Sequence, residues 1–131
     1  IRPTVIVRVP NAPDFVEGVV DLRNRVLPVV DLRKRFGMPA GEITDSTRIV
    51  VAEVKESIIG LIVDSVSEVI RIPSNSVEPV PMMITNAESG FLSGIARVRD
   101  GLVILLDLTK LFSWSEVREL DEAALEMEQS D

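Results

Sequence analysis

The sequence of 131 residues contains no cysteine and no histidine, and only 4% of its residues are aromatic. Without cysteine the chain can form no disulfide, thiol nucleophile or zinc–thiolate site, and without histidine it has no imidazole for acid–base catalysis. Apolar residues still make up 46% of the chain, so its core must be built from valine, isoleucine and leucine. This β-branched composition, with eight prolines and seven glycines, favours short strands and turns over long helices.

Long apolar runs are also absent. No segment approaches the roughly 18–20 apolar residues that cross a bilayer. The start, Ile1-Arg2-Pro3, lacks the apolar core of a secretory signal. We therefore expect a cytoplasmic protein with no direct membrane insertion.

Negative charge is concentrated at one end of the chain. The formal net charge is −7, and residues 116–131 hold seven acidic residues and one arginine, which leaves −1 for the rest. This balance does not suit a polyanionic partner, so we expect no nucleic-acid binding. Five cations within 13 positions are either a solvated turn and helix face or a partner-docking patch: Arg23, Arg25, Arg33, Lys34 and Arg35.

The sequence is organised around residues 18–37, GVVDLRNRVLPVVDLRKRFG. Two apolar runs flank an arginine-rich turn in which Asn24 suits a positive φ, and this pattern predicts a β-hairpin. Asp31 is placed to cap a short helical turn over Leu32–Phe36, which Gly37 would end. The predicted order is therefore strand, tight turn, strand and helical turn.

Further strands are expected on both sides of this stretch. Apolar runs predict them at residues 5–9, 48–54, 58–64, 66–72, 91–98 and 102–106. Helical spacing of the apolar residues leaves a helix open as an alternative for 66–72. The pair Asp100-Gly101 predicts a hairpin between the last two strands. Trp114–Met127 is predicted to be a helix whose apolar side packs on its own domain.

Residues 94–113 repeat the pattern of residues 18–37 without a gap, at an offset of 76. Six identities carry this match: Gly18/Gly94, Arg23/Arg99, Asp31/Asp107, Leu32/Leu108, Lys34/Lys110 and Phe36/Phe112. Upstream, three residues match at an offset of 71: Ile6, Val9 and Pro10 with Val77, Val80 and Pro81. The repeat predicts two structurally related β halves.

These halves suggest a division of the single domain, residues 1–131. Residues 1–46 would form an incomplete first barrel half that ends in the loop 37–46. Residues 47–113 would form the second half, and 114–131 the C-terminal helix and acidic tail. The second half carries about two dozen residues, 48–71, without a counterpart in the first, so the first barrel would lack its two N-terminal strands. Truncation is the simpler explanation, and a strand-swapped dimer is the alternative.

Candidate catalytic groups are not evident. The aspartates that could act in pairs fall at cap, turn or strand-end positions: Asp21, Asp31, Asp64, Asp100 and Asp107. Ser65 and Ser67 have no histidine to activate them, and no glycine-rich nucleotide loop is present. We therefore expect no enzyme activity, no catalytic residue, no cofactor and no metal site.

Four blocks of the sequence, in this order, closely resemble the CheW family of bacterial chemotaxis coupling proteins: VPNAPDFVEGVVDLRNRVLPVVDLRKRFG, TRIVVAEV, IGLIVDSVSEVIRIP and LVILLDLTKLF. The resemblance spans about residues 7–112. It implies a mainly β fold of two five-stranded, SH3-like barrel subdomains with a hydrophobic core between them. It also implies a non-enzymatic adaptor that links chemoreceptor tips to the regulatory domain of the CheA histidine kinase.

The resemblance further implies partner-binding residues. Gly18, Leu22 and Arg23 match the family's G-x-x-N-L-R-G segment, whose glycine and arginine serve receptor and kinase coupling. This chain has Asp21 in place of the asparagine, and this carboxylate could pair with Arg23 and compete with a partner. Asn24 replaces the second glycine and still suits the turn. The candidate partner-binding residues are Gly18, Leu22, Arg23, Asn24 and Arg25.

Other functions stay open at this point. The same fold could be a module of a larger signalling protein, either the regulatory end of a kinase or an adaptor fused to a receiver domain. An oligonucleotide- or sugar-binding β-barrel is less favoured, because one tryptophan, four phenylalanines and no tyrosine provide no stacking platform. A hydrolase that uses buried carboxylates is disfavoured by the cap positions of the aspartates.

Overall fold

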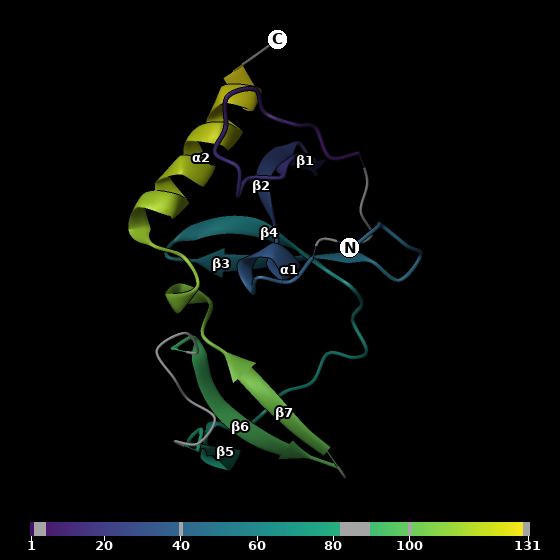
Figure 1. Cartoon of the computed structure of the whole chain (residues 1–131), viewed down its shortest axis with the longest axis vertical. Helices are drawn as coiled ribbons and strands as arrows, with labels where there is room; N and C mark the ends of the chain where they lie inside the picture. Colours follow the sequence, from purple (N-terminus) through teal and green to yellow (C-terminus); the bar gives the residue numbers. More distant parts are fainter. Residues whose placement is uncertain (2–4, 40, 82–89, 100, 130–131) are drawn as a thin grey trace. The chain divides into compact units, whose positions relative to one another are not determined.

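The computed structural model describes residues 1, 5–39, 41–81, 90–99 and 101–129, and it is mainly β with short helices and one long helix (Figure 1). The elements are β1 (Gly18–Leu22), β2 (Arg25–Asp31), α1 (Leu32–Arg35), β3 (Arg48–Val54), β4 (Ser57–Val63), η1 (Ser74–Ser76), β5 (Val77–Glu78), β6 (Leu92–Val98), β7 (Gly101–Leu106), η3 (Leu108–Lys110) and α2 (Trp114–Gln129). The predicted fold class is confirmed, whereas closure of either sheet into a barrel stays a prediction.

The described strands form two sheets. One has four strands in the order β1-β2-β4-β3, and the other has three in the order β5-β6-β7. The pairs β1–β2 and β3–β4 are antiparallel, whereas β2 and β4 run parallel, with Val29 opposite Gly60. The backbone of Ile1 exchanges two hydrogen bonds with Ile49, of 2.8 and 2.6 Å, on the outer edge of β3.

The chain divides into two compact units, and the division differs from the predicted one. The first unit holds residues 1–67 and 114–131, and the second holds residues 68–113. Strands β3 and β4 therefore belong with β1 and β2, although the sequence had assigned residues 47–113 to the second half. The physical reason is the parallel pairing of β2 with β4, which buries both strands in one sheet. The loop 37–46 connects α1 with β3 inside the first unit.

The core of the first unit is aliphatic. Its buried cluster consists of Val20, Leu27, Val29, Ile49 and Ile62. Helix α2 packs against β1, β2 and β4 of the same unit, and its buried residues include Val117, Leu120 and Ala124. The predicted C-terminal helix and its inward side are confirmed, because these three apolar residues fall on one face at helical spacing.

Two predicted strands do not form. Residues 66–72 have no regular structure, and Val69 is 92% exposed. This segment leads from the first unit into the second and has no strand to pair with in the part of the chain that the structure describes. In residues 5–9 only Val7 makes a bridge, to Val19, because the chain turns where the Ala12 N–H donates to Val9. Asp100 of the predicted Asp-Gly turn lies outside the described residues.

The internal repeat is confirmed by the register of its strands. Gly18 lies opposite Val29, and Gly94 lies opposite Leu105. Each residue of the second pair is therefore 76 positions after its counterpart in the first pair. Val7 lies opposite Val19, and Glu78 lies opposite Ile95, which reproduces the upstream offset of 71. Two hairpins of related sequence therefore pair in the same register, each with a preceding segment on the same edge.

Candidate functional site

The β1–β2 hairpin ends in the two-residue turn Arg23–Asn24. Leu22 pairs with Arg25, and the turn residues have φ values of +52° and +63°. Two left-handed residues in a two-residue loop make a type I′ turn, whose twist matches that of the flanking strands. The positive φ predicted for Asn24 is confirmed. For Arg23 the same conformation costs about 1–2 kcal/mol, because an arginine has a Cβ atom that glycine lacks.

The five predicted site residues do not share one surface. Gly18 is buried, and Leu22 is half-buried and packs against the core cluster. A Cβ atom on Gly18 would lie 2.4 Å from the Val7 carbonyl oxygen, so this glycine lets the preceding segment approach β1. Arg23, Asn24 and Arg25 are exposed at the tip. These three residues are the exposed members of the predicted group and are called the hairpin tip below.

The hairpin tip carries two arginines, Arg23 and Arg25. Neither Arg23 nor Arg25 pairs with an acidic residue in the described part of the chain. Asp21, which could have paired with Arg23, makes no such pair among the described residues and is exposed on β1. Both guanidinium groups are therefore available to a partner carboxylate.

The remaining cations of the basic group are engaged within the first unit. Lys34 pairs with Glu17, and Arg35 pairs with Glu116. Arg33 is buried, with only 8% of its surface exposed. The five cations are thus not one solvated face, because Arg33 is buried and both Lys34 and Arg35 are paired within the first unit.

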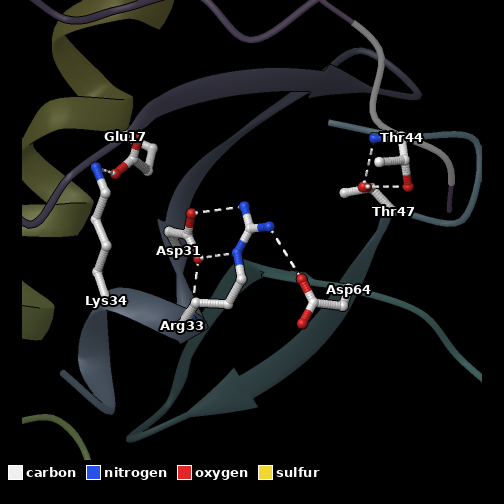
Figure 2. A network of polar contacts seen from close by, with 7 residues as sticks. All are labelled: Glu17, Asp31, Arg33, Lys34, Thr44, Thr47 and Asp64. Carbon is white, nitrogen blue, oxygen red and sulfur yellow. Dashed lines mark hydrogen bonds and ion pairs between the residues drawn. The ribbon is translucent and has the colours of Figure 1, made fainter. Parts of the chain in front are cut away.

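Arg33 lies between two carboxylates, as Figure 2 shows. Its Nε and Nη2 atoms donate to Asp31 at 3.0 and 2.9 Å, and its Nη1 atom donates to Asp64 at 3.0 Å. Asp31 also caps α1, because its Oδ1 atom accepts from the Arg33 N–H at 3.0 Å. The predicted cap is confirmed. The sequence did not show that a residue of the capped helix, Arg33, also binds the Asp31 carboxylate through its buried side chain.

Burial and Arg33 act on the Asp31 carboxyl in opposite directions. Burial raises the pKa of Asp31, while the hydrogen bonds and positive charge of Arg33 lower it, and the sum leaves the pKa below its ordinary value of 3.8. The hydrogen bonds that Arg33 donates to Asp31 in turn raise the pKa of the Arg33 guanidinium. The pair stays ionised across the physiological range, and it fixes α1 to the end of β2.

The loop before β3 covers this ion network. Thr44 and Thr47 hold the loop together, because the Thr44 N–H donates to Thr47 Oγ1 at 2.8 Å and Thr47 is buried (Figure 2). A Cβ atom on Gly41 would lie 3.0 Å from Arg33 Nη1. The loop therefore packs closely over the guanidinium and keeps water from it.

A cleft of about 360 Å³ begins beside Arg25. It lies between the start of β2, the β3–β4 turn and the last turns of α2. The Val26 N–H donates to Glu128 at 3.2 Å, and the Ser57 hydroxyl donates to Asp121 at 2.7 Å. Sequence reasoning missed this cleft, since the helical pattern of α2 predicts a buried side but not which strands will meet it.

Neither a metal site nor a membrane-spanning helix is present in the described part of the chain. Within the described residues, no three acidic side chains gather where they could hold a metal ion. In the same part of the chain, no helix is long and apolar enough to span a membrane.

The comparisons with known proteins agree with one another. Residues 1–116 match the family model of the CheW-like domain. A chemotaxis protein CheW of Rhizobium meliloti is 38% identical over 110 residues, which cover 84% of this chain and 70% of the relative. The corresponding protein of Thermotoga maritima is 34% identical, with 91% of this chain and 77% of the relative covered.

A solved structure supports the same assignment. The crystal structure of the scaffolding protein TtCheW from Thermoanaerobacter tengcongensis is similar to this chain with a TM-score of 0.72 and 39% sequence identity, covering 86% of this chain and 77% of that one. Sequence, strand pattern and fold therefore lead to one conclusion: the chain belongs to the CheW family.

Proposed function

We propose that this protein is a non-enzymatic adaptor of bacterial chemotaxis. It couples the cytoplasmic signalling tips of chemoreceptors to the regulatory domain of a CheA-type histidine kinase, and it acts in the cytoplasm. Membership of the CheW family and the likeness to a solved CheW scaffold support this function. An adaptor needs a stable framework and a few oriented charges rather than a reactive group, and the described side chains fit that need.

The observation that carries the proposal is that Arg23 has a strained backbone and, in the described chain, no ion pair. This residue lies in the left-handed region, where glycine or asparagine would cost less, and its guanidinium has no ion-pair partner in the described chain. Strain without an internal benefit points to a role in binding. A guanidinium suits such a role because its planar fork is preorganised for a carboxylate. We assign the hairpin tip to the partner interface.

The test separates binding from stability at this one position. Arg23→Gly should raise the free energy of unfolding by about 1 kcal/mol, since it relieves the backbone strain. The same change should weaken binding to a receptor-tip fragment or to the kinase regulatory domain about tenfold, and Arg23→Glu should weaken it further. Urea unfolding and isothermal titration calorimetry measure the two effects.

Arg99 provides the matched control. It occupies the same turn position in the second hairpin, with φ +55°, but it already pairs with Glu68 at 3.4 Å. Arg99→Gly should leave binding within about twofold. Unchanged affinity of Arg23→Glu for both partners would remove the hairpin tip from the interface, and failure of the wild-type protein to bind either partner would contradict the adaptor function.

A further inference from the structure

The ion network around Arg33 carries a surplus negative charge. Two carboxylates, Asp31 and Asp64, share one guanidinium, so the three groups together carry −1. Asp31 is almost fully buried and uses both of its oxygens on Arg33, whereas the Asp64 side chain is 68% exposed and accepts through Oδ1 alone. The surplus charge is therefore presented to solvent on the second oxygen of Asp64.

A small pocket lies directly beside this carboxylate. Its volume is about 190 Å³, and its lining, which is mostly apolar, is Leu32, Arg33, Phe36, Met38, Val63 and Asp64. Met38 is 52% exposed, so an apolar wall of the pocket is open to solvent. The pocket lies at the α1 end of β2, and the hairpin tip lies at the opposite end of the same strand.

We propose that this pocket receives a lysine or arginine side chain of a protein partner. The aliphatic stem of that side chain would pack against Leu32, Met38 and Val63, and its cationic end would bind Asp64 Oδ2. Long basic side chains combine an apolar stem with a charged end, which matches an apolar pocket with a carboxylate at its rim. The inference rests on the proposed adaptor function and adds a second point of attachment to it.

Charge and desolvation together select this occupant. An acidic side chain would be repelled by Asp64, and a purely apolar one would remove water from that carboxylate without replacing its hydrogen bonds. In the described chain, Arg33 is the one cation that pairs with Asp64, and the nearby Lys34 is engaged by Glu17. Arg33 in turn is held by Asp31 and covered by the loop, so the hydrogen bond to Asp64 Oδ1 comes from a positioned guanidinium.

The experiment removes the surplus negative charge at Asp64 and measures binding to the two partners. Asp64→Asn keeps the size of the side chain but removes its charge, and Met38→Ala removes part of the apolar wall. Affinity for a receptor-tip fragment and for the kinase regulatory domain is measured by calorimetry with the whole 131-residue chain. Asp64→Asn should weaken binding to at least one of the two probes about tenfold, and Met38→Ala about threefold.

Asp45→Asn is the matched control, because Asp45 is an exposed aspartate of the loop before β3 and the change removes the same charge. It should leave both affinities within about twofold. An equal loss in Asp64→Asn and Asp45→Asn would show general electrostatic attraction and overturn the pocket. Unchanged binding of Asp64→Asn, with a wild-type protein that binds, would overturn the pocket and leave the adaptor function standing. A wild-type protein that binds neither probe would overturn both.

Discussion

The hairpins β1–β2 and β6–β7 have the same local design and different surroundings. Both pair in the same register, and both begin their turn with an arginine in the left-handed region, Arg23 and Arg99. Strand β2 lies between β1 and β4 and is covered by α2. Strand β7 lies at the edge of its sheet and exposes Leu102, Ile104 and Leu106. The repeat therefore sets the geometry of each hairpin, and the neighbouring elements set how much of it is buried.

The helical turns that follow the hairpins show the same contrast. Asp31 and Asp107 each cap the turn through a backbone N–H at 3.0 Å. The residue that donates this bond is the buried Arg33 in the first copy and the exposed Thr109 in the second. The first copy therefore adds to its cap a buried guanidinium, which also binds Asp64. Three predictions test how far this difference matters.

The largest loss of folding stability is expected from a change at Arg33. Arg33→Met leaves the buried Asp31 carboxylate without its guanidinium, which should lower the free energy of unfolding by about 3–5 kcal/mol. Asp64 adds little to this loss, since it is exposed. The corresponding change in the second copy, Thr109→Val, should cost no more than about 1 kcal/mol. Urea unfolding monitored by circular dichroism compares the two.

A double variant checks the cause of that loss. Asp31→Asn combined with Arg33→Met removes the unpaired charge while an asparagine can still cap α1, so it should be more stable than Arg33→Met alone. If the double variant is the less stable of the two, the loss reflects packing of the arginine stem instead of the orphaned carboxylate.

The next largest loss of stability is expected at the two glycines that match in the repeat, Gly18 and Gly94. A Cβ atom on Gly18 would meet the Val7 carbonyl oxygen at 2.4 Å, whereas on Gly94 it would meet Val77 Cγ1 at 2.5 Å. The Val77 methyl can rotate away, which leaves the Cβ atom at position 94 only a milder backbone contact, 3.2 Å from the Glu78 carbonyl oxygen. The hydrogen-bonded Val7 carbonyl oxygen cannot move away in this manner. We expect Gly18→Ala to cost about 2–3 kcal/mol and Gly94→Ala about 1 kcal/mol. Gly90→Ala, where a Cβ atom has nothing within 4 Å, is the neutral control. Equal costs at positions 18 and 94 would contradict this account.

The smallest effect is the dependence of stability on acid. Because the pKa of Asp31 is lowered in the folded chain, its contribution is complete above the ordinary value of 3.8. As the pH falls below 3.8 and through the lower folded pKa, the carboxylate is protonated and the contribution is lost. Urea unfolding over a series of acidic pH values should show a shallower loss of stability for Asp31→Asn than for the wild type. An unchanged slope would assign the acid sensitivity to other carboxylates.

Much of the local structure could be predicted from the sequence. The turn at Asn24, the caps at Asp31 and Asp107, the β6–β7 pairing and the inward face of α2 all depend on residues close together in the chain, whose preferences are strong. The repeat register was also predictable, because it follows from matching residues at a constant offset. Of the candidate site, the exposure of Arg23–Arg25 follows from their place in a tight turn.

The features that sequence reasoning missed depend on distant neighbours. Residues 66–72 have the pattern of a strand, yet no described strand edge pairs with them. Arg33 was grouped with surface cations, because the residues near it in the sequence do not predict its contacts with Asp64 or with the covering loop. The roles of Gly18 and Leu22 shift toward packing for the same reason.

The sequence alone determined the two hairpins, their capped turns, the C-terminal helix and the resemblance to the CheW family. Only the tertiary structure decided that β3 and β4 join the first hairpin, that Arg33 is buried between two aspartates, and that Asp64 stands beside an apolar pocket. Turn and cap preferences act over a few neighbouring residues. The pairing of β2 with β4 and the burial of Arg33 instead depend on segments far apart in the sequence that pack together and exclude water.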